Sequence, residues 1–160
     1  MLMKRSSNAK HTRNGRDLVR QWSEEFTERI LVDLGKAFPN YNVKLFSDRN
    51  VSLMTCHSCQ IKEFVDTDVL IAMHGAGMAN MLYMQPNRAI VEIGPYTNDG
   101  RCLLGGGPFS RAAFVMSHNY MVHHPPYEEF KWISEGKVSE FNVTRFVRHV
   151  HSFLKSIDYV

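Results

Sequence analysis

Hydrophobic residues recur at helical spacing near both ends of the chain. The first series predicts a helix over residues 16–38, and the second predicts a helix over residues 143–157. The first series consists of Leu18, Trp22, Phe26, Ile30 and Leu34; the second consists of Val143, Phe146, Val147, Val150, Phe153, Leu154 and Ile157. Asn14 or Asp17 is a candidate cap for the first helix, and Asn142 is one for the last.

Between these helices lie the continuous apolar run Val69–Met73 and the mainly apolar segment Ala89–Ile93, which contains Glu92. Runs without strict alternation are typical of strands that are covered on both faces. Further strands are predicted at 42–46 and 120–123, and further helices at 55–65, 77–84 and 109–117. Strands that alternate with helices predict a parallel sheet with right-handed crossovers. We therefore expect a three-layer α/β fold of Rossmann type, with one domain over residues 1–160 and a core over residues 40–124.

The composition indicates one globular domain. The chain has 160 residues, of which 44% are hydrophobic and 22% charged, so disorder along its whole length is excluded. The longest apolar runs are five residues, whereas a membrane span needs about 20. Residues 1–5 do not form a signal peptide. We expect either a cytosolic protein or a chain that has lost an upstream targeting segment.

Positive charge gathers at the start of the chain. Residues 1–20 hold six basic residues and one acidic residue, a net charge of +5, whereas the whole chain carries +3. Such a cluster suits an anionic partner, most often phosphate, although a solvated N-terminal segment explains it as well. The overall charge is too weak to indicate nucleic-acid binding, and we expect none.

The most informative local feature is the turn His74-Gly75-Ala76-Gly77-Met78-Ala79-Asn80, between an apolar run and a helix. Glycines let the backbone approach a ligand closely, and N–H groups at the start of a helix attract anions. In open α/β sheets, ligands bind at the carboxyl ends of the strands. Glu92 ends the next strand, where its carboxylate can accept hydrogen bonds from sugar hydroxyls. Together these residues predict a site for a nucleotide or a nucleotide sugar.

Two alternatives remain open for this turn. Its spacing is close to the dinucleotide fingerprint G-x-G-x-x-G, so an NAD-dependent oxidoreductase is one of them. Against that fingerprint, Asn80 replaces the third glycine, the following helix is short, and a whole βαβ unit precedes the turn. The other alternative is a glycine turn with a purely structural role.

The 26 residues from Asp68 to Ile93 closely resemble the signature of glycosyltransferase family 61. They read DVLIAMHGAGMANMLYMQPNRAIVEI, against a family pattern of roughly a-D-v-l-v-g-x-H-G-A-G-l-t-N, a few apolar residues, x-P and v-v-E-i. Gln60 and Phe64 fit the helix that precedes this signature. The N-terminal segment is similar more loosely, with Arg5 and Asn14 at family positions.

This resemblance implies the fold and the activity. It implies one lobe of a GT-B fold, namely the C-terminal lobe that binds the donor, with a separate N-terminal lobe as its partner. It also implies inverting transfer of GlcNAc or a pentose from a UDP-sugar to a hydroxyl of a protein or polysaccharide. The catalytic base is expected on the other lobe, so a non-catalytic or degenerate nucleotide-sugar-binding lobe is the alternative. Members of the family imply a place in the ER or Golgi.

The same resemblance, with the chemistry of the turn, assigns the donor site. Its residues are Arg5, Arg13, Asn14, His74, Gly75, Ala76, Gly77, Asn80 and Glu92. The two arginines and the backbone of the turn would stabilise the departing diphosphate. His74 would donate a hydrogen bond to phosphate or sugar, and Glu92 would hold a hydroxyl of the ribose or sugar. No bound metal and no other cofactor are expected, and the chain has no D-x-D motif.

Other motifs favour structural interpretations. The three cysteines cannot build a disulfide framework, and Cys56-His57-Ser58-Cys59 is interpreted as a helix start, because a zinc site needs more ligands and a redox site needs a thioredoxin-like context. The histidines near residues 123 and 149 have no acidic or cysteine partner at ligand spacing. Asn50 and Asn142 begin N-glycosylation sequons, and Asn142 is equally a helix cap.

Overall fold

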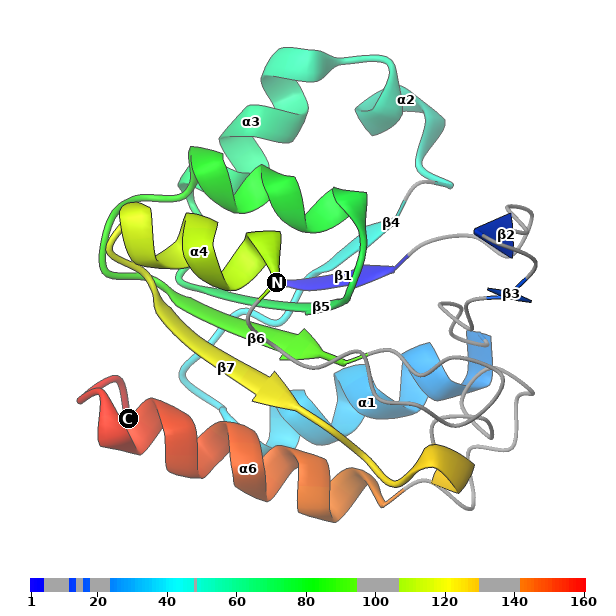
Figure 1. The fold of residues 1–160 in the computed structure, drawn as a ribbon, viewed down its shortest axis with the longest axis vertical. Coiled ribbons are helices and arrows are strands. Elements are labelled where there is room, and N and C mark those ends of the chain that lie inside the picture. Colours follow the sequence, from blue (N-terminus) through cyan, green and yellow to red (C-terminus); the bar gives the residue numbers. More distant parts are fainter. Residues whose placement is uncertain (5–11, 14–15, 18–23, 48, 95–106, 130–141) are drawn as a thin grey trace.

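The computed structural model describes residues 1–4, 12–13, 16–17, 24–47, 49–94, 107–129 and 142–160. Within these ranges the chain forms a five-stranded parallel sheet with helices on both faces (Figure 1). The strands of this sheet are β1 (Leu2–Lys4), β4 (Leu45–Ser47), β5 (Val69–Met73), β6 (Ala89–Ile93) and β7 (Asn119–His123). The helices are α1 (Glu24–Ala37), α2 (Val51–Met54), α3 (His57–Val65), η1 (Ala76–Tyr83), α4 (Pro108–Val115) and α6 (Val143–Ser156).

The order in which the chain adds strands to the sheet reverses once. The order across the sheet is β4-β1-β5-β6-β7, so the chain first moves outward from β1 to β4. It then crosses to the other side of β1 and continues outward through β5, β6 and β7. Because all neighbours are parallel, the carboxyl ends of all five strands lie at one edge. The switch point lies between β1 and β5, which is where open α/β sheets of this strand order bind ligands.

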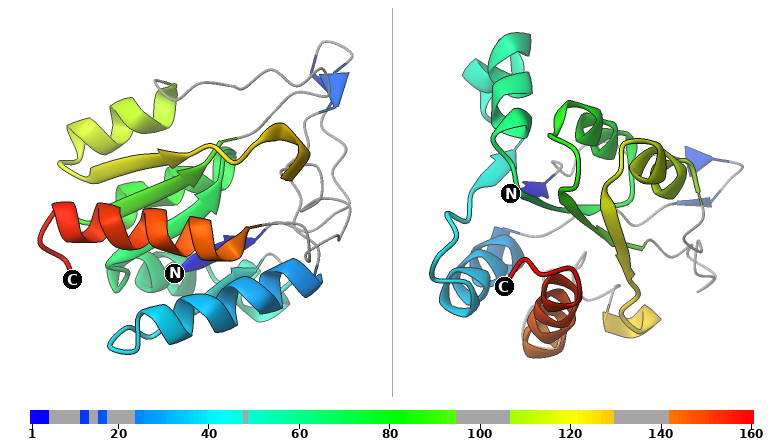
Figure 2. Two further views of the ribbon diagram at one scale, coloured as in Figure 1. Left: turned by 90° about the horizontal axis from the view of Figure 1, so that it is seen from below. Right: turned by 90° about the vertical axis from the view of Figure 1, so that its left-hand side faces the viewer.

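Both faces of the sheet are buried, as the apolar run Val69–Met73 predicts. In β5, Val69 and Ile71 face the layer of α1 and α6, whereas Leu70 and Ala72 face the layer that contains η1 and α4 (Figure 2). Period-two alternation therefore supplies both hydrophobic cores from one strand. The mixed α/β fold with a parallel, Rossmann-like sheet is confirmed.

The last helix follows its predicted pattern closely. Its buried residues are Val143, Phe146, Val150 and Leu154. Their spacing of three and four residues places them on one face of α6, against the sheet and α1. The side chain of Asn142 accepts a hydrogen bond of 2.8 Å from the N–H of Arg145, so the predicted cap is confirmed.

The helix after the glycine turn lies where it is predicted, but it is a 3₁₀ helix rather than an α-helix. Its buried methionines, Met78 and Met81, are three residues apart, and Met84 follows at the same interval. A helix with three residues per turn places all three side chains in one row. This row packs into the core on the η1 face.

The N-terminal part of the chain differs from its prediction in two ways. Arg16–Asp17 forms β3, which pairs in antiparallel register with β2 (Thr12–Arg13), and the described helix α1 begins at Glu24. A helix from residue 16 and a cap at Asp17 are therefore wrong, and Asn14 lies outside the described residues. In addition, β1 was not predicted, because three residues are too few for a periodic pattern to show. The sheet thus includes a strand from outside residues 40–124.

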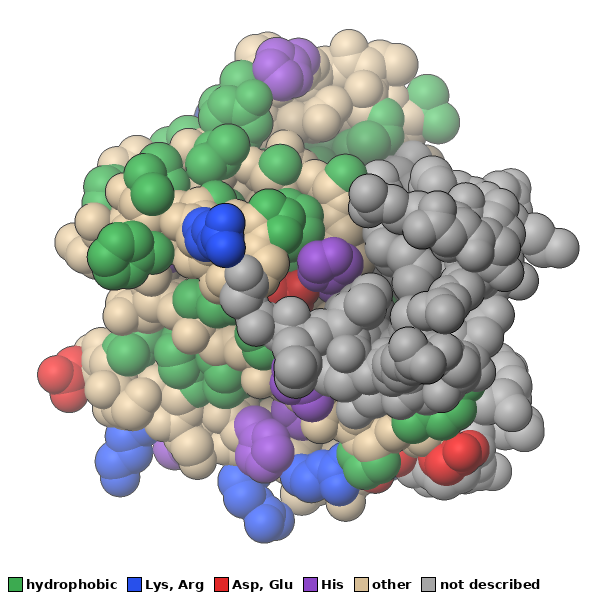
Figure 3. Space-filling view, viewed as in Figure 1, with side chains coloured by type: hydrophobic (Ala, Val, Ile, Leu, Met, Phe, Trp, Pro, Cys, Tyr) green, Lys and Arg blue, Asp and Glu red, His purple; other side chains and the backbone are tan. Residues whose placement is uncertain are grey.

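Large hydrophobic side chains are exposed on the layer of η1 and α4 (Figure 3). Phe114 and Val115, at the end of α4, are 83% and 78% exposed, and Leu82 on η1 is 50% exposed. In the described parts of the chain, no helix has the length and apolar character needed to cross a membrane.

We expect Phe64→Ala to lower the free energy of unfolding by about 3–5 kcal/mol, because Phe64 is completely buried and its removal leaves a cavity in the core beneath α3. The same substitution at the exposed Phe114 is the matched control, with a change within about 0.5 kcal/mol. Urea denaturation followed by circular dichroism measures both variants. Equal losses in the two variants would contradict this assignment of the core.

Candidate functional site

The candidate site lies at the carboxyl edge of the sheet, where β5, β6 and β7 end level with one another. Met73 pairs with Ile93, and Ile93 pairs with His123. The N–H of His74 donates to the carbonyl of Ile93 at 3.1 Å, which carries the pairing one residue beyond β5. Backbone hydrogen bonds therefore fix where the glycine turn begins.

Two of the predicted donor-site residues meet at this edge. Glu92 precedes the last residue of β6 and faces the η1 layer, where it is only 4% exposed. Its Oε1 contacts Nδ1 of His74, which follows β5 directly. The ring of His74 also packs edge-on against Phe109 of α4, with ring centroids 5.2 Å apart. Phe109 was not predicted, because only the tertiary fold brings α4 over this edge.

This contact gives Glu92 a different immediate partner from the expected sugar hydroxyl. A buried carboxylate is costly unless it accepts hydrogen bonds, and the imidazole supplies one. The carboxylate in turn makes Nδ1 the donor nitrogen and leaves Nε2 as the nitrogen of His74 that can meet a ligand. The side chain of His74 is 24% exposed, so a ligand can reach it. Glu92 therefore positions His74.

The glycine turn presents backbone donors beside this pair. Gly75 is buried and extended, and it precedes η1 without a side-chain cap. Its carbonyl accepts the first helical hydrogen bond, 2.9 Å from the N–H of Met78. The N–H groups of Ala76 and Gly77 come before that bond, so the geometry of a 3₁₀ helix gives them no intrahelical acceptor. Ala76 is exposed, and Gly77 and Asn80 are partly buried.

Of the three donor-site residues predicted near the N-terminus, Arg5, Arg13 and Asn14, the structure describes only Arg13. Arg13 belongs to β2, and its backbone pairs with Arg16 in β3. Arg5 follows β1 directly in the sequence, but Arg5 and Asn14 lie outside the described residues. The contribution of these three residues to the donor site stays a prediction.

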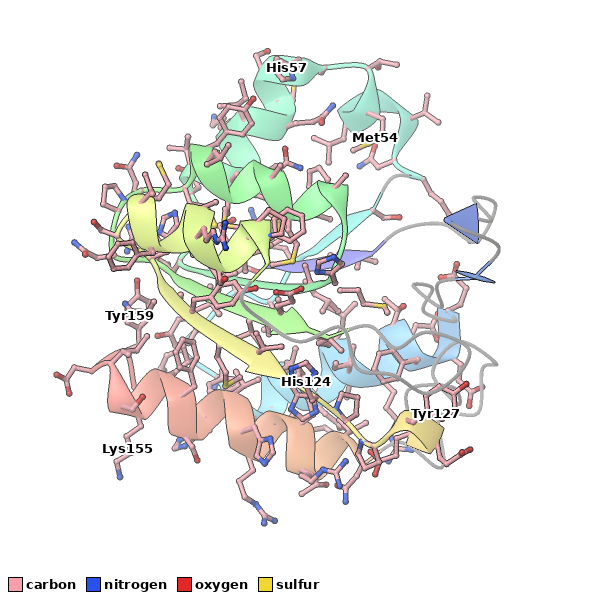
Figure 4. The ribbon with its side chains drawn as sticks, viewed as in Figure 1. Met54, His57, His124, Tyr127, Lys155 and Tyr159 are labelled. Atoms are coloured by element: carbon pink, nitrogen blue, oxygen red, sulfur yellow. A yellow bond between two sulfur atoms is a disulfide. The ribbon has the colours of Figure 1, made fainter. Side chains whose placement is uncertain are left out.

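A pair of histidines, His123 of β7 and His149 of α6, lies on the opposite face of the sheet. His123 is 2% exposed, and its Nδ1 lies 3.1 Å from Nδ1 of His149, while its ring packs edge-on against Phe146. Its Nε2 is buried without a hydrogen-bond partner in the described part of the protein. Burial, assisted by the nearby His149, Arg145 and His124, lowers the pKa of His123 to about 3. His123 is therefore neutral near pH 7. Figure 4 marks His124, the residue after β7.

Cys56 and Cys59 form a disulfide, which the sequence interpretation did not foresee. The predicted helix start is confirmed, because Cys56 caps α3 and its sulfur accepts a hydrogen bond of 3.2 Å from the N–H of Cys59. Among the described residues, no three His, Cys, Asp or Glu side chains gather as a metal site requires.

The two sequon asparagines share a second role. Asn50 caps α2, with its side chain accepting from the N–H of Leu53 at 3.2 Å, and Asn142 caps α6. Both are exposed, and their glycosylation stays a prediction.

A cavity of about 290 Å³ opens at the opposite, amino edge of the sheet. Its lining includes Phe38, Tyr41, Lys44, Asp66 and Asp68. It contains none of the predicted donor-site residues, so its position does not support a donor site there.

Comparison with known families matches the chain to one family model. The family model described as Glycosyltransferase 61 matches residues 1–91, which is more than half of the chain. The matched region contains the whole glycine turn and ends one residue before Glu92. No curated protein matches the chain.

The low pKa of His123 predicts a pH dependence of stability. The unfolded chain takes up this proton near pH 6.5 and the folded protein only near pH 3, so stability that is present above about pH 6.5 is lost as the pH falls. Between pH 7 and pH 5 we expect a loss of about 1–2 kcal/mol from this residue. Urea denaturation at both pH values measures it.

His123→Gln should remove that part of the pH dependence, whatever its effect on stability at pH 7. His57→Gln is the control, because His57 is exposed and its replacement should leave the slope unchanged. A slope that persists in His123→Gln would show that other groups cause it.

Proposed function

The chain belongs to glycosyltransferase family 61, and on this premise we propose that it forms a donor-binding lobe of GT-B type. Membership of this family of transferases implies a nucleotide-sugar donor and an acceptor. In this proposal the lobe serves inverting transfer of GlcNAc or a pentose from a UDP-sugar to a hydroxyl of a protein or polysaccharide. The observation that carries the proposal is the position of the glycine turn. It follows β5, which borders the switch point on its β1 side and carries the contact between His74 and Glu92 on its β6 side.

The diphosphate of the donor would lie against the start of η1. Ala76 and Gly77 offer backbone N–H groups there, and the absence of a side-chain cap at Gly75 leaves that end of the helix open to an anion. Since Arg5 follows β1, its sequence position suits the same edge. The net charge of residues 1–20 favours the same ligand.

The proposed reaction is a single displacement at the anomeric carbon of the sugar. The acceptor oxygen forms a bond to the anomeric carbon of the sugar while the bond from that carbon to the diphosphate oxygen breaks. The acceptor proton passes to a base that we expect on another lobe, and negative charge grows on the departing diphosphate. Donors held in fixed positions stabilise that charge. His74, oriented by Glu92, would add a donor at Nε2 when its ring is protonated. We expect no metal ion to be needed.

The same site is compatible with a lobe that binds nucleotide sugars without transferring them. Binding of UDP is common to both functions, whereas release of free sugar from UDP-GlcNAc or UDP-xylose requires chemistry. The family suggests the secretory pathway, and we propose the ER or Golgi as the place of action.

Titration of UDP into the ¹⁵N-labelled chain tests donor binding. We expect the amide signals of residues 74–80 to shift, because their N–H groups would contact the diphosphate. A folded chain with no shift at these amides would refute the proposal. Enhanced NADH fluorescence in its place would favour the oxidoreductase.

We expect Gly77→Val to abolish measurable UDP binding while the fold persists, because the added side chain occupies space that the phosphates need. Isothermal titration calorimetry measures the affinity, and circular dichroism measures folding. Gly35→Val is the matched control: Gly35 lies on α1, and a Cβ there meets no atom within 4 Å. Unchanged affinity in Gly77→Val would contradict the placement of the diphosphate.

A further inference from the structure

The disulfide between Cys56 and Cys59 lies at the surface, at the beginning of α3. Only two residues, His57 and Ser58, separate the bridged cysteines. Cys59 is exposed and Cys56 is half-buried. Figure 4 shows His57 at the outer end of α3, on the periphery of the molecule. Solvent and small reagents can therefore reach the bridge.

Stabilisation of the fold explains this disulfide poorly. The stabilisation that a disulfide gives increases with the length of the chain segment that it closes, and this segment is one of the shortest possible. The bridge also links no two elements of the fold, because Cys56 is the cap of the helix that contains Cys59. Its removal would leave the sheet and both hydrophobic cores connected as before.

The local geometry suits exchange of the disulfide. Cys56 occupies the N-cap position of the nine-residue helix α3, and its sulfur accepts the N–H of Cys59 at 3.2 Å. The hydroxyl of Ser58 lies 3.5 Å from the same sulfur. A negative charge on Cys56 would therefore be stabilised by a hydrogen bond and by the dipole of α3. Since a stabilised thiolate is a good leaving group, Cys56 is favoured as the sulfur that departs.

The fold supplies the context that the sequence alone did not show. The C-x-x-C motif begins a helix that connects β4 to β5 in a parallel sheet. A cysteine pair at the start of a helix within a β-α-β connection is the setting in which reactive disulfides occur. Here α2 and α3 form the connection, and the first cysteine is the N-cap of α3.

We propose that Cys56 and Cys59 form a thiol–disulfide exchange site that reacts with low-molecular-weight thiols such as glutathione. A glutathione thiolate attacks the sulfur of the exposed residue Cys59, a mixed disulfide forms, and Cys56 leaves as a thiolate. A second glutathione thiolate then attacks the glutathione sulfur of the mixed disulfide and releases Cys59. Two glutathione molecules are thereby oxidised to glutathione disulfide, and the two cysteines take up their two protons and electrons. This site is separate from the glycine turn, so it does not depend on the proposed donor site.

Reduction of the bridge in glutathione buffers tests the proposal directly. The chain carries Cys102→Ser so that only one cysteine pair can react, and alkylation followed by mass spectrometry counts the free thiols. We expect the bridge to be reduced by millimolar reduced glutathione and to form again with glutathione disulfide, while circular dichroism stays unchanged. A bridge that stays oxidised until the chain is unfolded would overturn the proposal.

Two single-thiol variants test the assigned roles of the sulfurs. In the Cys102→Ser background, Cys59→Ser leaves Cys56 alone, and Cys56→Ser leaves Cys59 alone with serine as a good replacement cap. We expect iodoacetamide to alkylate Cys56 at half its maximal rate at least one pH unit below the corresponding pH for Cys59. In urea this difference should vanish, because the helix is lost. Coincident profiles in the folded variants would refute the role of α3 in stabilising the Cys56 thiolate.

Discussion

Parallel pairing of β5 with β6 is the interaction on which the candidate site depends. It places Ala72 opposite Glu92 and Met73 opposite Ile93, so the residue that follows β5 emerges beside a carboxylate that precedes the end of β6. A shift of one residue would turn Glu92 to the other face and separate it from His74. The hydrophobic side chains on both faces of the two strands hold this register, because a shift would expose or misplace all of them. Stability of the core and geometry of the site therefore have the same origin.

Much of the fold follows from patterns that extend over many residues. The unbroken run Val69–Met73 indicates a strand covered on both faces, and the spacing from Val143 to Leu154 indicates one buried helix face. The glycine turn was also placed correctly, because glycines that interrupt an apolar run mark the end of a strand. In the site, the proximity of His74 and Glu92 follows from the rule that adjacent parallel strands end at one edge.

Other features depend on tertiary contacts that local sequence does not encode. Strand β1 has three residues, and its place between β4 and β5 comes from pairing with segments more than 40 residues away. Phe109 reaches His74 only because α4 packs over the sheet. The disulfide between Cys56 and Cys59 depends on a helix whose N-cap is Cys56 itself. Sequence patterns locate the ends of helices only within a few residues, so they did not predict this disulfide. The start assigned to α1 at residue 16 failed because Arg16 and Asp17 pair with β2, a contact that hydrophobic spacing does not reveal.

The row formed by Met78, Met81 and Met84 has a mechanical consequence for the turn ahead of it. These three methionine side chains are buried beneath η1 and pack it against the hydrophobic core. Methionine side chains change rotamer readily and fill irregular spaces, so they can follow a small axial slide of the helix without opening a void. A 3₁₀ helix rises about 2.0 Å per residue and an α-helix about 1.5 Å, so a local change of winding would move Gly75 and Ala76 along the axis. Packing on methionines therefore permits a small axial adjustment of the glycine turn without loss of the core beneath it.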